Sequence, residues 1–217
     1  MHDIGRGLCW ALDAVPFAED RLGFVPDAWQ AQLLRSRSQW ILLNCCRQSG
    51  KSTTTAIVAL HQAIYDPGLV LCVSPSLRQS RELFAKVIGF LKSIEPVIPL
   101  EEDNKSSCEL SNGSRIVSLP GDPDTVRGYS APKLVITDEA AYVSDAMQAA
   151  IAPMLAVSQG RQIDMSSPSR AICLIPKAGG EAAPPPNRYD ATMLPMPVVS
   201  GEPKVTTEAP SSRRRTI

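Results

Sequence analysis

Short apolar runs alternate along the chain with longer stretches in which apolar side chains recur at helical spacing. Three runs are apolar or small throughout, which is typical of strands buried on both faces of a sheet, and they cover residues 40–43, 69–73 and 134–137. A fourth strand is expected over residues 162–165, and helices are expected over residues 27–35, 52–65, 76–92 and 144–156. Such alternation predicts an α/β fold whose mostly parallel sheet is covered by helices on both faces.

Local signals sharpen several boundaries. Asp27 follows Pro26 and is the expected N-cap of the first of these helices. Asn112-Gly113 separates two apolar stretches, residues 108–110 and 115–119, and predicts a tight hairpin. In the helix over residues 76–92 the expected core face consists of Leu77, Leu83, Phe84, Val87, Ile88 and Leu91.

The 217 residues divide into three expected parts. Residues 1–23 form an N-terminal segment, and residues 24–170 form one globular domain. The remaining 47 residues, 171–217, contain eight prolines and show no periodic apolar pattern beyond Ile175. This tail is predicted to be disordered because it offers too little apolar surface to bury.

Composition and charge exclude several classes of protein. Basic and acidic residues both number 22, so the net charge is zero and any DNA contact must come from a local patch. The six cysteines lack metal-ligand spacing and are expected to be reduced thiols. With no signal peptide and no apolar run long enough to cross a bilayer, the chain is expected in the cytoplasm, with no membrane partner.

The segment from Arg47 to Ser52 has the features of a phosphate-binding loop. It follows a buried strand and precedes a helix, so backbone N–H groups and a helix N-terminus would face the phosphates. Lys51 would pair with the outer phosphates, and Ser52 would ligate Mg²⁺. Cys45 stands where the strict pattern requires glycine, and a chance Gly-Lys-Ser at a helix start is the alternative.

The strand over residues 134–137 runs directly into Asp138 and Glu139. Adjacent carboxylates at the mouth of a sheet repel each other, and a bound cation relieves the repulsion. Asp138 would hold Mg²⁺, and Glu139 would polarise the attacking water. A solvated turn before a helix is the alternative, but both segments together predict hydrolysis of a nucleoside triphosphate.

Three further side chains have open assignments. Gln30 carries the donor and the acceptor that an adenine edge requires, or it is a surface helix residue. Arg47 could stabilise charge on the γ-phosphate, or it is a solvated loop arginine. Arg127 could sense nucleotide or reach a neighbouring subunit's site, or it is structural.

These residues resemble a known family. The loop Arg-Gln-Ser-Gly-Lys-Ser, the Pro-x-x-Trp-Gln element that ends at Gln30 and the Asp-Glu-Ala-Ala strand end resemble the ATPase domain of large terminase subunits. These are the DNA-packaging motors of tailed bacteriophages and prophages. The resemblance covers about residues 24–168, and it includes the segment 119–128 before the acidic strand.

The resemblance implies a P-loop ATPase of the RecA-like and helicase-like class, with Mg²⁺ as cofactor. Its expected catalytic residues are Glu139, Lys51 and Arg47, and its expected metal ligands are Ser52 and Asp138. Ser166 and Ser167 would couple hydrolysis to movement, with Arg127 as a sensor. The residues expected to bind ATP are Gln30, Arg47, Gln48, Ser49, Gly50, Lys51, Ser52 and Thr53.

The implied partners are ATP, double-stranded DNA, a portal protein and a small terminase subunit, in a homo-oligomeric ring. Large terminases normally continue into a nuclease domain, whereas only four scattered acidic residues follow Arg170. Nuclease activity is therefore not expected in this chain, and the tail could be an out-of-frame product of a decayed gene. A helicase-like ATPase and a non-catalytic nucleotide-binding remnant are the alternative functions.

Overall fold

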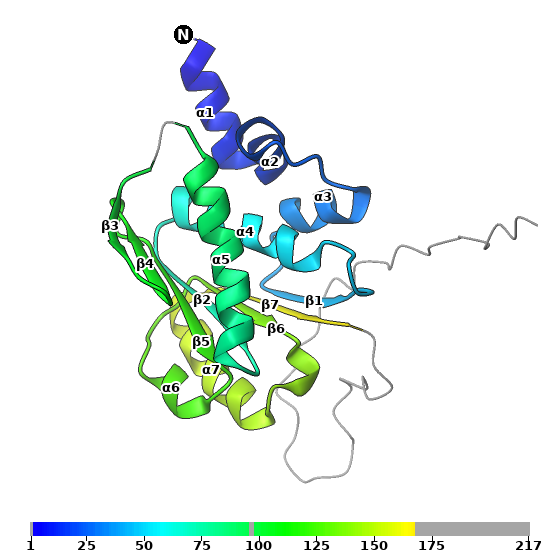
Figure 1. Ribbon diagram of the computed structural model, residues 1–217, viewed down its shortest axis with the longest axis vertical. Coiled ribbons are helices and arrows are strands. Elements are labelled where there is room, and N and C mark those ends of the chain that lie inside the picture. The colour runs from blue at the N-terminus through cyan, green and yellow to red at the C-terminus, as the bar shows by residue number, and fades with distance from the viewer. Residues whose placement is uncertain (1, 96–97, 168–217) are drawn as a thin grey trace, which may run out of the picture.

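The computed structural model describes residues 2–95 and 98–167, which build one seven-stranded sheet with helices on both sides (Figure 1). The strand order across the sheet is β1-β7-β6-β2-β5-β4-β3. The proline-rich tail predicted from the sequence lies outside the described residues, and so do residues 168–170. The expected division of the chain at residues 23 and 170 stays a prediction.

Five strands run parallel, and they are the part of the sheet that carries the predicted site. They are β1 (Trp40–Asn44), β7 (Arg161–Ser166), β6 (Leu134–Asp138), β2 (Leu69–Ser74) and β5 (Arg115–Pro120). Two antiparallel strands, β4 (Ser107–Leu110) and β3 (Leu100–Asp103), extend the sheet beyond β5. The Asn112-Gly113 turn joins β4 to β5, with Gly113 at φ +82°, which confirms the predicted hairpin.

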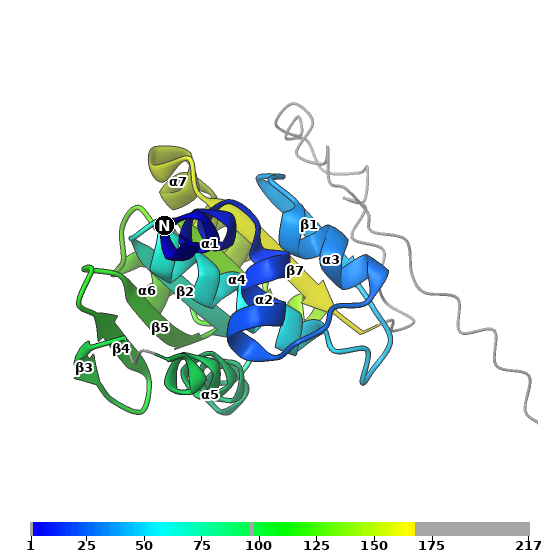
Figure 2. The same cartoon turned by 90° about the horizontal axis from the view of Figure 1, so that it is seen from above.

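Each face of the sheet has its own apolar core (Figure 2). On one face, α4 (Lys51–Tyr65) and α5 (Leu77–Ser93) pack against side chains that include Ile41, Ile136 and Ile163. On the other face, α6 (Pro123–Arg127) and α7 (Asp145–Ser158) cover Leu71, Val117 and Val135. The predicted α/β architecture with two covered faces is therefore confirmed.

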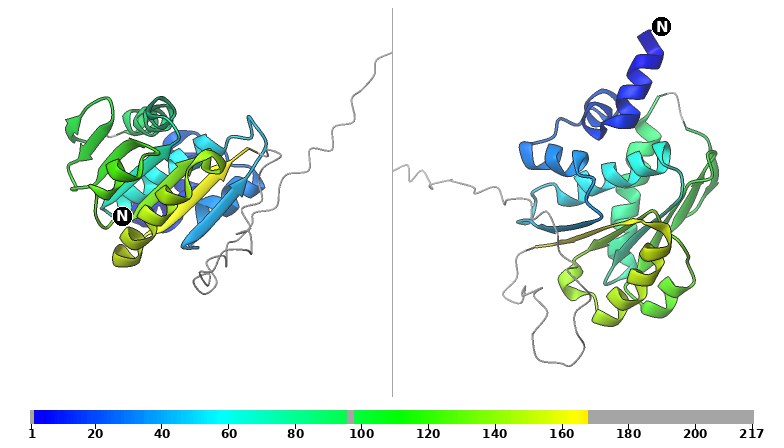
Figure 3. Two further views of the ribbon diagram at one scale, coloured as in Figure 1. Left: turned by 90° about the horizontal axis from the view of Figure 1, so that it is seen from below. Right: turned by 180° about the vertical axis from the view of Figure 1, so that it is seen from behind.

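The N-terminal residues add two helices that the sequence pattern did not predict. Helix α1 (His2–Leu12) projects from one end of the domain, and α2 (Ala14–Leu22) lies beneath it (Figures 1 and 3). Asp13 caps α2 by accepting a hydrogen bond from the backbone N–H of Val15. The side chain of Phe17 is buried at 1% exposure and meets the rings of His61 and Tyr65 on α4 edge-on. Helix α2 thus shares the core that lies beneath α4.

Helix α3 (Ala28–Arg35) begins after Asp27, as expected. The helix predicted over residues 76–92 is α5, and every expected core residue except Leu77 is buried there. Among residues 2–95 and 98–167, no helix is both long and apolar enough to cross a membrane. None of the five cysteines in the same ranges forms a disulfide within them, and Cys173 lies outside these ranges.

Candidate nucleotide-binding site

The carboxyl ends of β1, β7 and β6 lie side by side, and each ends in polar residues. Asn44 of β1 pairs with Ser166 of β7, and Asp138 of β6 pairs with Met165 of β7. A single strand, β7, therefore lies between the strand that leads into the phosphate loop and the strand that leads into the acidic pair. Ligand sites in parallel α/β sheets lie at this edge because the loops and helix N-termini converge there.

The loop between β1 and α4 has the backbone shape of an anion-binding site. Gln48 and Gly50 both adopt left-handed conformations, with φ +62° and +86°, and such turns aim successive N–H groups into one concavity. Helix α4 begins at Lys51, so its N-terminal N–H groups face the same space. Cys45, which breaks the strict sequence pattern, is buried, and its backbone N–H donates to the Ser166 carbonyl at 3.2 Å.

Gln30 holds this loop from outside the sheet. Its amide oxygen accepts from the backbone N–H of Asp27 at 2.9 Å, and its amide nitrogen donates to the Ser49 carbonyl at 3.4 Å. A Cβ atom added at Gly50 would lie only 2.7 Å from that amide nitrogen. The left-handed backbone favours glycine at this position, and a side chain there would have to displace the end of the Gln30 side chain. The surface-residue alternative is wrong, since Gln30 is 5% exposed, and adenine contact stays a prediction.

Lys51 is the buried cation of the site. The ammonium nitrogen donates to the Ser167 hydroxyl at 2.9 Å and lies 3.9 Å from the Glu139 carboxylate. Its side chain is only 10% exposed, so these contacts replace much of the water that an ammonium would otherwise bind. The fold thus brings together three residues that the sequence places up to 116 positions apart.

The acidic pair sits at a sharp turn. Glu139 lies between the end of β6 and the 3₁₀ turn Ala140–Tyr142, and its backbone is left-handed, with φ +49°. Its backbone N–H donates to the Asp138 carboxylate at 2.9 Å, and its own carboxylate lies 3.5 Å from the Ser166 hydroxyl. Burial raises the pKa of Asp138, and the negative charge of Glu139 adds to the shift, whereas the hydrogen bond from the Glu139 backbone and the charge of Lys51 oppose it. Added positive charge would therefore be stabilising beside Asp138.

A sequence model described as "Terminase large subunit, T4likevirus-type, N-terminal" matches residues 42–171. The chain belongs to the terminase large-subunit family. No curated protein sequence gives a significant match.

Solved structures show the same terminase fold. The ATPase domain of the Thermus phage P74-26 large terminase has a TM-score of 0.66 at 22% identity, covering 73% of this chain and 71% of that one. The HK97 bacteriophage large terminase has a TM-score of 0.59 at 17% identity, covering 72% and 37%. The large terminase of a thermophilic bacteriophage, solved in complex with ADP, has a TM-score of 0.52 at 10% identity, covering 65% and 39%. The terminase chain described here thus spans well under half the length of the last two proteins.

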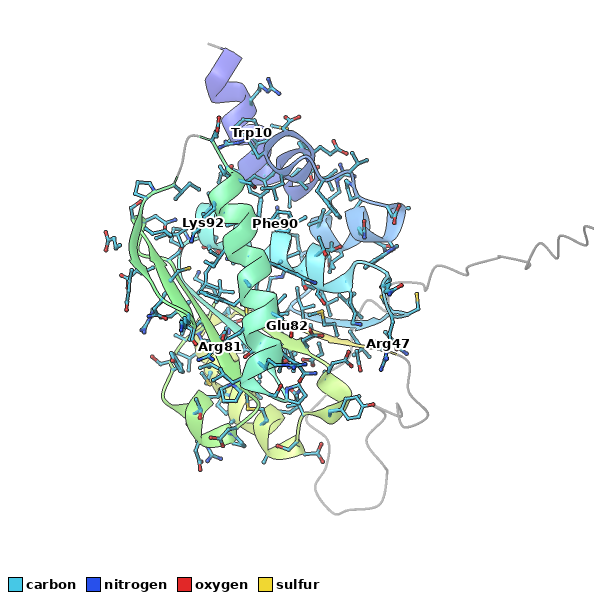
Figure 4. The ribbon with its side chains drawn as sticks, in the orientation of Figure 1. Trp10, Arg47, Arg81, Glu82, Phe90 and Lys92 are labelled. Atoms are coloured by element: carbon cyan, nitrogen blue, oxygen red, sulfur yellow. The ribbon has the colours of Figure 1, made fainter. Side chains whose placement is uncertain are left out.

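Two predicted arginines lie outside this cluster of contacts. Arg47 is exposed on the loop before α4, and Figure 4 shows it well away from Arg81 and Glu82 of α5. Arg127 is exposed at the end of α6, where its guanidinium binds the Asp124 carboxylate at 2.7 Å. Their predicted roles toward phosphate or a neighbouring subunit stay predictions.

Asn44 was not singled out from the sequence. Its Oδ1 atom is buried without a hydrogen-bond partner among the described residues, as is Ser49 Oγ in the phosphate loop. A polar residue that ends a buried apolar strand directly before a phosphate loop is the signal that would have identified Asn44. Buried polar atoms without partners are uncommon in folded proteins and mark positions where a ligand or water can bind.

Proposed function

We propose that this terminase domain hydrolyses ATP and thereby drives movement of double-stranded DNA during phage packaging. One observation carries the proposal. Lys51, in the phosphate loop that follows β1, lies 3.9 Å from Glu139, which follows β6, and β6 is the second strand from β1 in the sheet. A phosphate-binding cation beside a carboxylate that can act on water is the arrangement that triphosphate hydrolysis requires.

The loop residues would bind the phosphates mainly through their backbone. The N–H groups of Gln48, Ser49, Gly50 and Thr53 would donate to the phosphates, and Lys51 would neutralise the outer phosphates. Gln30 would contact adenine, since an amide nitrogen has a second N–H besides the one that it donates to Ser49.

Asp138 and Ser52 would hold Mg²⁺. They suit the ion because a hard cation prefers oxygen ligands and because the pKa of Asp138 is raised by burial and by Glu139. Within residues 2–95 and 98–167 no group of three or more His, Cys, Asp and Glu side chains could hold a metal unaided. The ion would therefore share its coordination with phosphate oxygens, whose developing negative charge it would neutralise.

Glu139 would accept a proton from the attacking water. Its carboxylate is partly exposed beside the Ser166 hydroxyl, so water can reach it while one oxygen is held in place. Arg47 would swing toward the γ-phosphate, and Arg127 would sense nucleotide in its own chain or a neighbouring one. Ser166 and Ser167 would pass the change at the phosphates to the segment that follows β7.

Partners are proposed on the basis of the family. The large terminase of the thermophilic bacteriophage was solved in complex with ADP, which supports an adenine nucleotide as the ligand. We infer double-stranded DNA, a portal protein and a small terminase subunit as partners of a ring of such chains in the host cytoplasm.

An ATPase assay with and without double-stranded DNA tests the proposal. Lys51→Ala should abolish nucleotide binding, whereas Glu139→Gln should keep binding and lower turnover by about 100-fold or more. Lys105→Ala and Glu101→Gln change exposed residues of the same types and should leave turnover unchanged. Turnover that survives in Glu139→Gln would remove Glu139 from the reaction, and a parent chain that binds but never hydrolyses nucleotide would leave only a binding function.

A further inference from the structure

Lys51 has two partners for its ammonium within the chain. Lys51 Nζ, which would bind the outer phosphates, instead donates to Ser167 Oγ at 2.9 Å and faces Glu139 Oε1 at 3.9 Å. Ser167 itself is only 9% exposed, so its contact with Lys51 is buried and does not lie on the surface. The bond joins the start of α4 to the residue directly after β7.

We propose that Ser167 is a positioning residue that latches Lys51 in the nucleotide-free state, and that the phosphates release this latch by taking over the ammonium. The inference rests on the proposed nucleotide-binding function. It adds a competition inside the chain, between the end of β7 and the outer phosphates, for the Lys51 ammonium.

The phosphates are expected to win this competition because the ammonium and an anionic phosphate oxygen attract each other as opposite charges, whereas the Ser167 hydroxyl is neutral. When Lys51 turns to them, Ser167 loses its donor and Glu139 loses its nearest cation. The carboxylate is then left with the neighbouring Ser166 hydroxyl, at 3.5 Å, and is free to act on water.

The two serines divide this work. Ser166 lies on β7 itself and its hydroxyl approaches Glu139, whereas Ser167 follows the strand and its hydroxyl reaches Lys51. The last residue of β7 and the residue that follows it thus contact the carboxylate and the ammonium, which lie 3.9 Å from each other. A change at Lys51 is therefore felt at the residue where the chain leaves the sheet.

Binding of ADP by calorimetry tests the latch, since ADP lacks the γ-phosphate that a sensing serine would contact. Removing the latch raises the free energy of the empty site alone, so Ser167→Ala should bind ADP about 3- to 10-fold more tightly than the parent. Ser167→Thr keeps the hydroxyl and should restore the parental affinity. Ser93→Ala, at an exposed serine, is the control that should change nothing. Where the parent binds ADP, unchanged or weaker binding in Ser167→Ala overturns the latch.

A second measurement needs no nucleotide. Limited acylation with acetic anhydride, followed by peptide mass spectrometry, should modify Lys51 several-fold faster in Ser167→Ala than in the parent, while exposed Lys105 reacts at one rate in both. Equal rates at Lys51 overturn the latch. Faster acylation in a chain that fails to bind ADP would support the latch and refute the proposed function, so the two failures are distinguishable.

Discussion

At the scale of single residues, Gly50 bears two constraints at once. Its φ of +86° disfavours any side chain, and a Cβ atom would press on the amide nitrogen of Gln30 at 2.7 Å. Gly113 has nearly the same φ, +82°, but nothing lies within 4 Å of the position that its Cβ would take. Alanine substitutions at the two glycines can therefore be compared to separate the cost of backbone strain from the cost of steric contact.

We predict that Gly50→Ala lowers the free energy of unfolding more than Gly113→Ala, which should cost about 1 kcal/mol through strain alone. The excess should shrink when Gln30→Ala is added, because the contacting amide is then gone. Urea unfolding of the three variants and the double variant measures both terms. An equal cost for the two glycine variants would mean that Gln30 does not press on the loop.

Asp164 is a carboxyl whose titration should be visible in stability. Burial raises its pKa, although the Gln162 amide nitrogen donates to both of its oxygens at 2.9 Å. The folded chain therefore holds this proton more tightly than the unfolded chain, and ionisation costs stability as the pH rises above the unfolded pKa of about 4.

Asp164→Asn should consequently raise the melting temperature by a few degrees at pH 7, and the gain should disappear as the pH falls toward 4. Asp122 is the control of opposite sign, because hydrogen bonds from the Thr125 side chain and the Asp124 backbone lower its pKa. Asp122→Asn should lose stability at pH 7 rather than gain it. Thermal melts over pH 4–8 would contradict the assignment if the Asp164→Asn gain did not depend on pH.

At the scale of elements, Phe17 is the largest of the α2 side chains that are buried in the core shared with α4. Phe17 is 1% exposed and meets His61 and Tyr65 at ring-centroid distances of 5.4 and 5.7 Å. Phe17→Ala should lower the free energy of unfolding by about 3 kcal/mol, because it leaves a cavity between the two helices. Val25→Ala, at 80% exposure, should change it by less than about 0.5 kcal/mol.

Denaturant midpoints would check this difference. A small effect of Phe17→Ala would show that α2 rests on the domain without contributing to its core.

The elements that the sequence predicted are those with strong local patterns. The apolar run 40–43 and the Asn112-Gly113 turn each specify their structure through nearby residues, and both were confirmed. Strand β3 was missed because Glu101 and Glu102 are poor strand residues, and it forms only by pairing with β4 at the edge of the sheet. Helix α6 has only five residues, too few to show a helical period.

The candidate site was predictable in its parts but not in its assembly. Lys51, Asp138 and Glu139 stand in recognisable local contexts, so their chemistry could be proposed from the sequence. That β7 lies between β1 and β6, so that Ser167 reaches Lys51, depends on long-range strand pairing that no local pattern encodes. The hydrogen bond from Gln30 to the Ser49 carbonyl is also a tertiary contact that no local pattern encodes.

At the scale of the whole molecule, a net charge of zero limits how the chain meets DNA. Because few phosphates can be neutralised by a local patch, the isolated chain should bind double-stranded DNA weakly. The slope of log affinity against log salt should be shallower than about −3. Fluorescence anisotropy between 50 and 200 mM salt measures this slope, and a value steeper than about −6 would reveal an extensive basic surface.

The position of β1 also fixes when the site can form. β1 is the edge strand of the seven-stranded sheet, and its neighbour β7 is the last of the seven to be synthesised. At bacterial translation rates the 116 positions between Lys51 and Ser167 take roughly ten seconds to emerge from the ribosome. Until then the phosphate loop has no strand beside it, so a nascent chain cannot become competent for nucleotide before nearly the whole domain has left the ribosome.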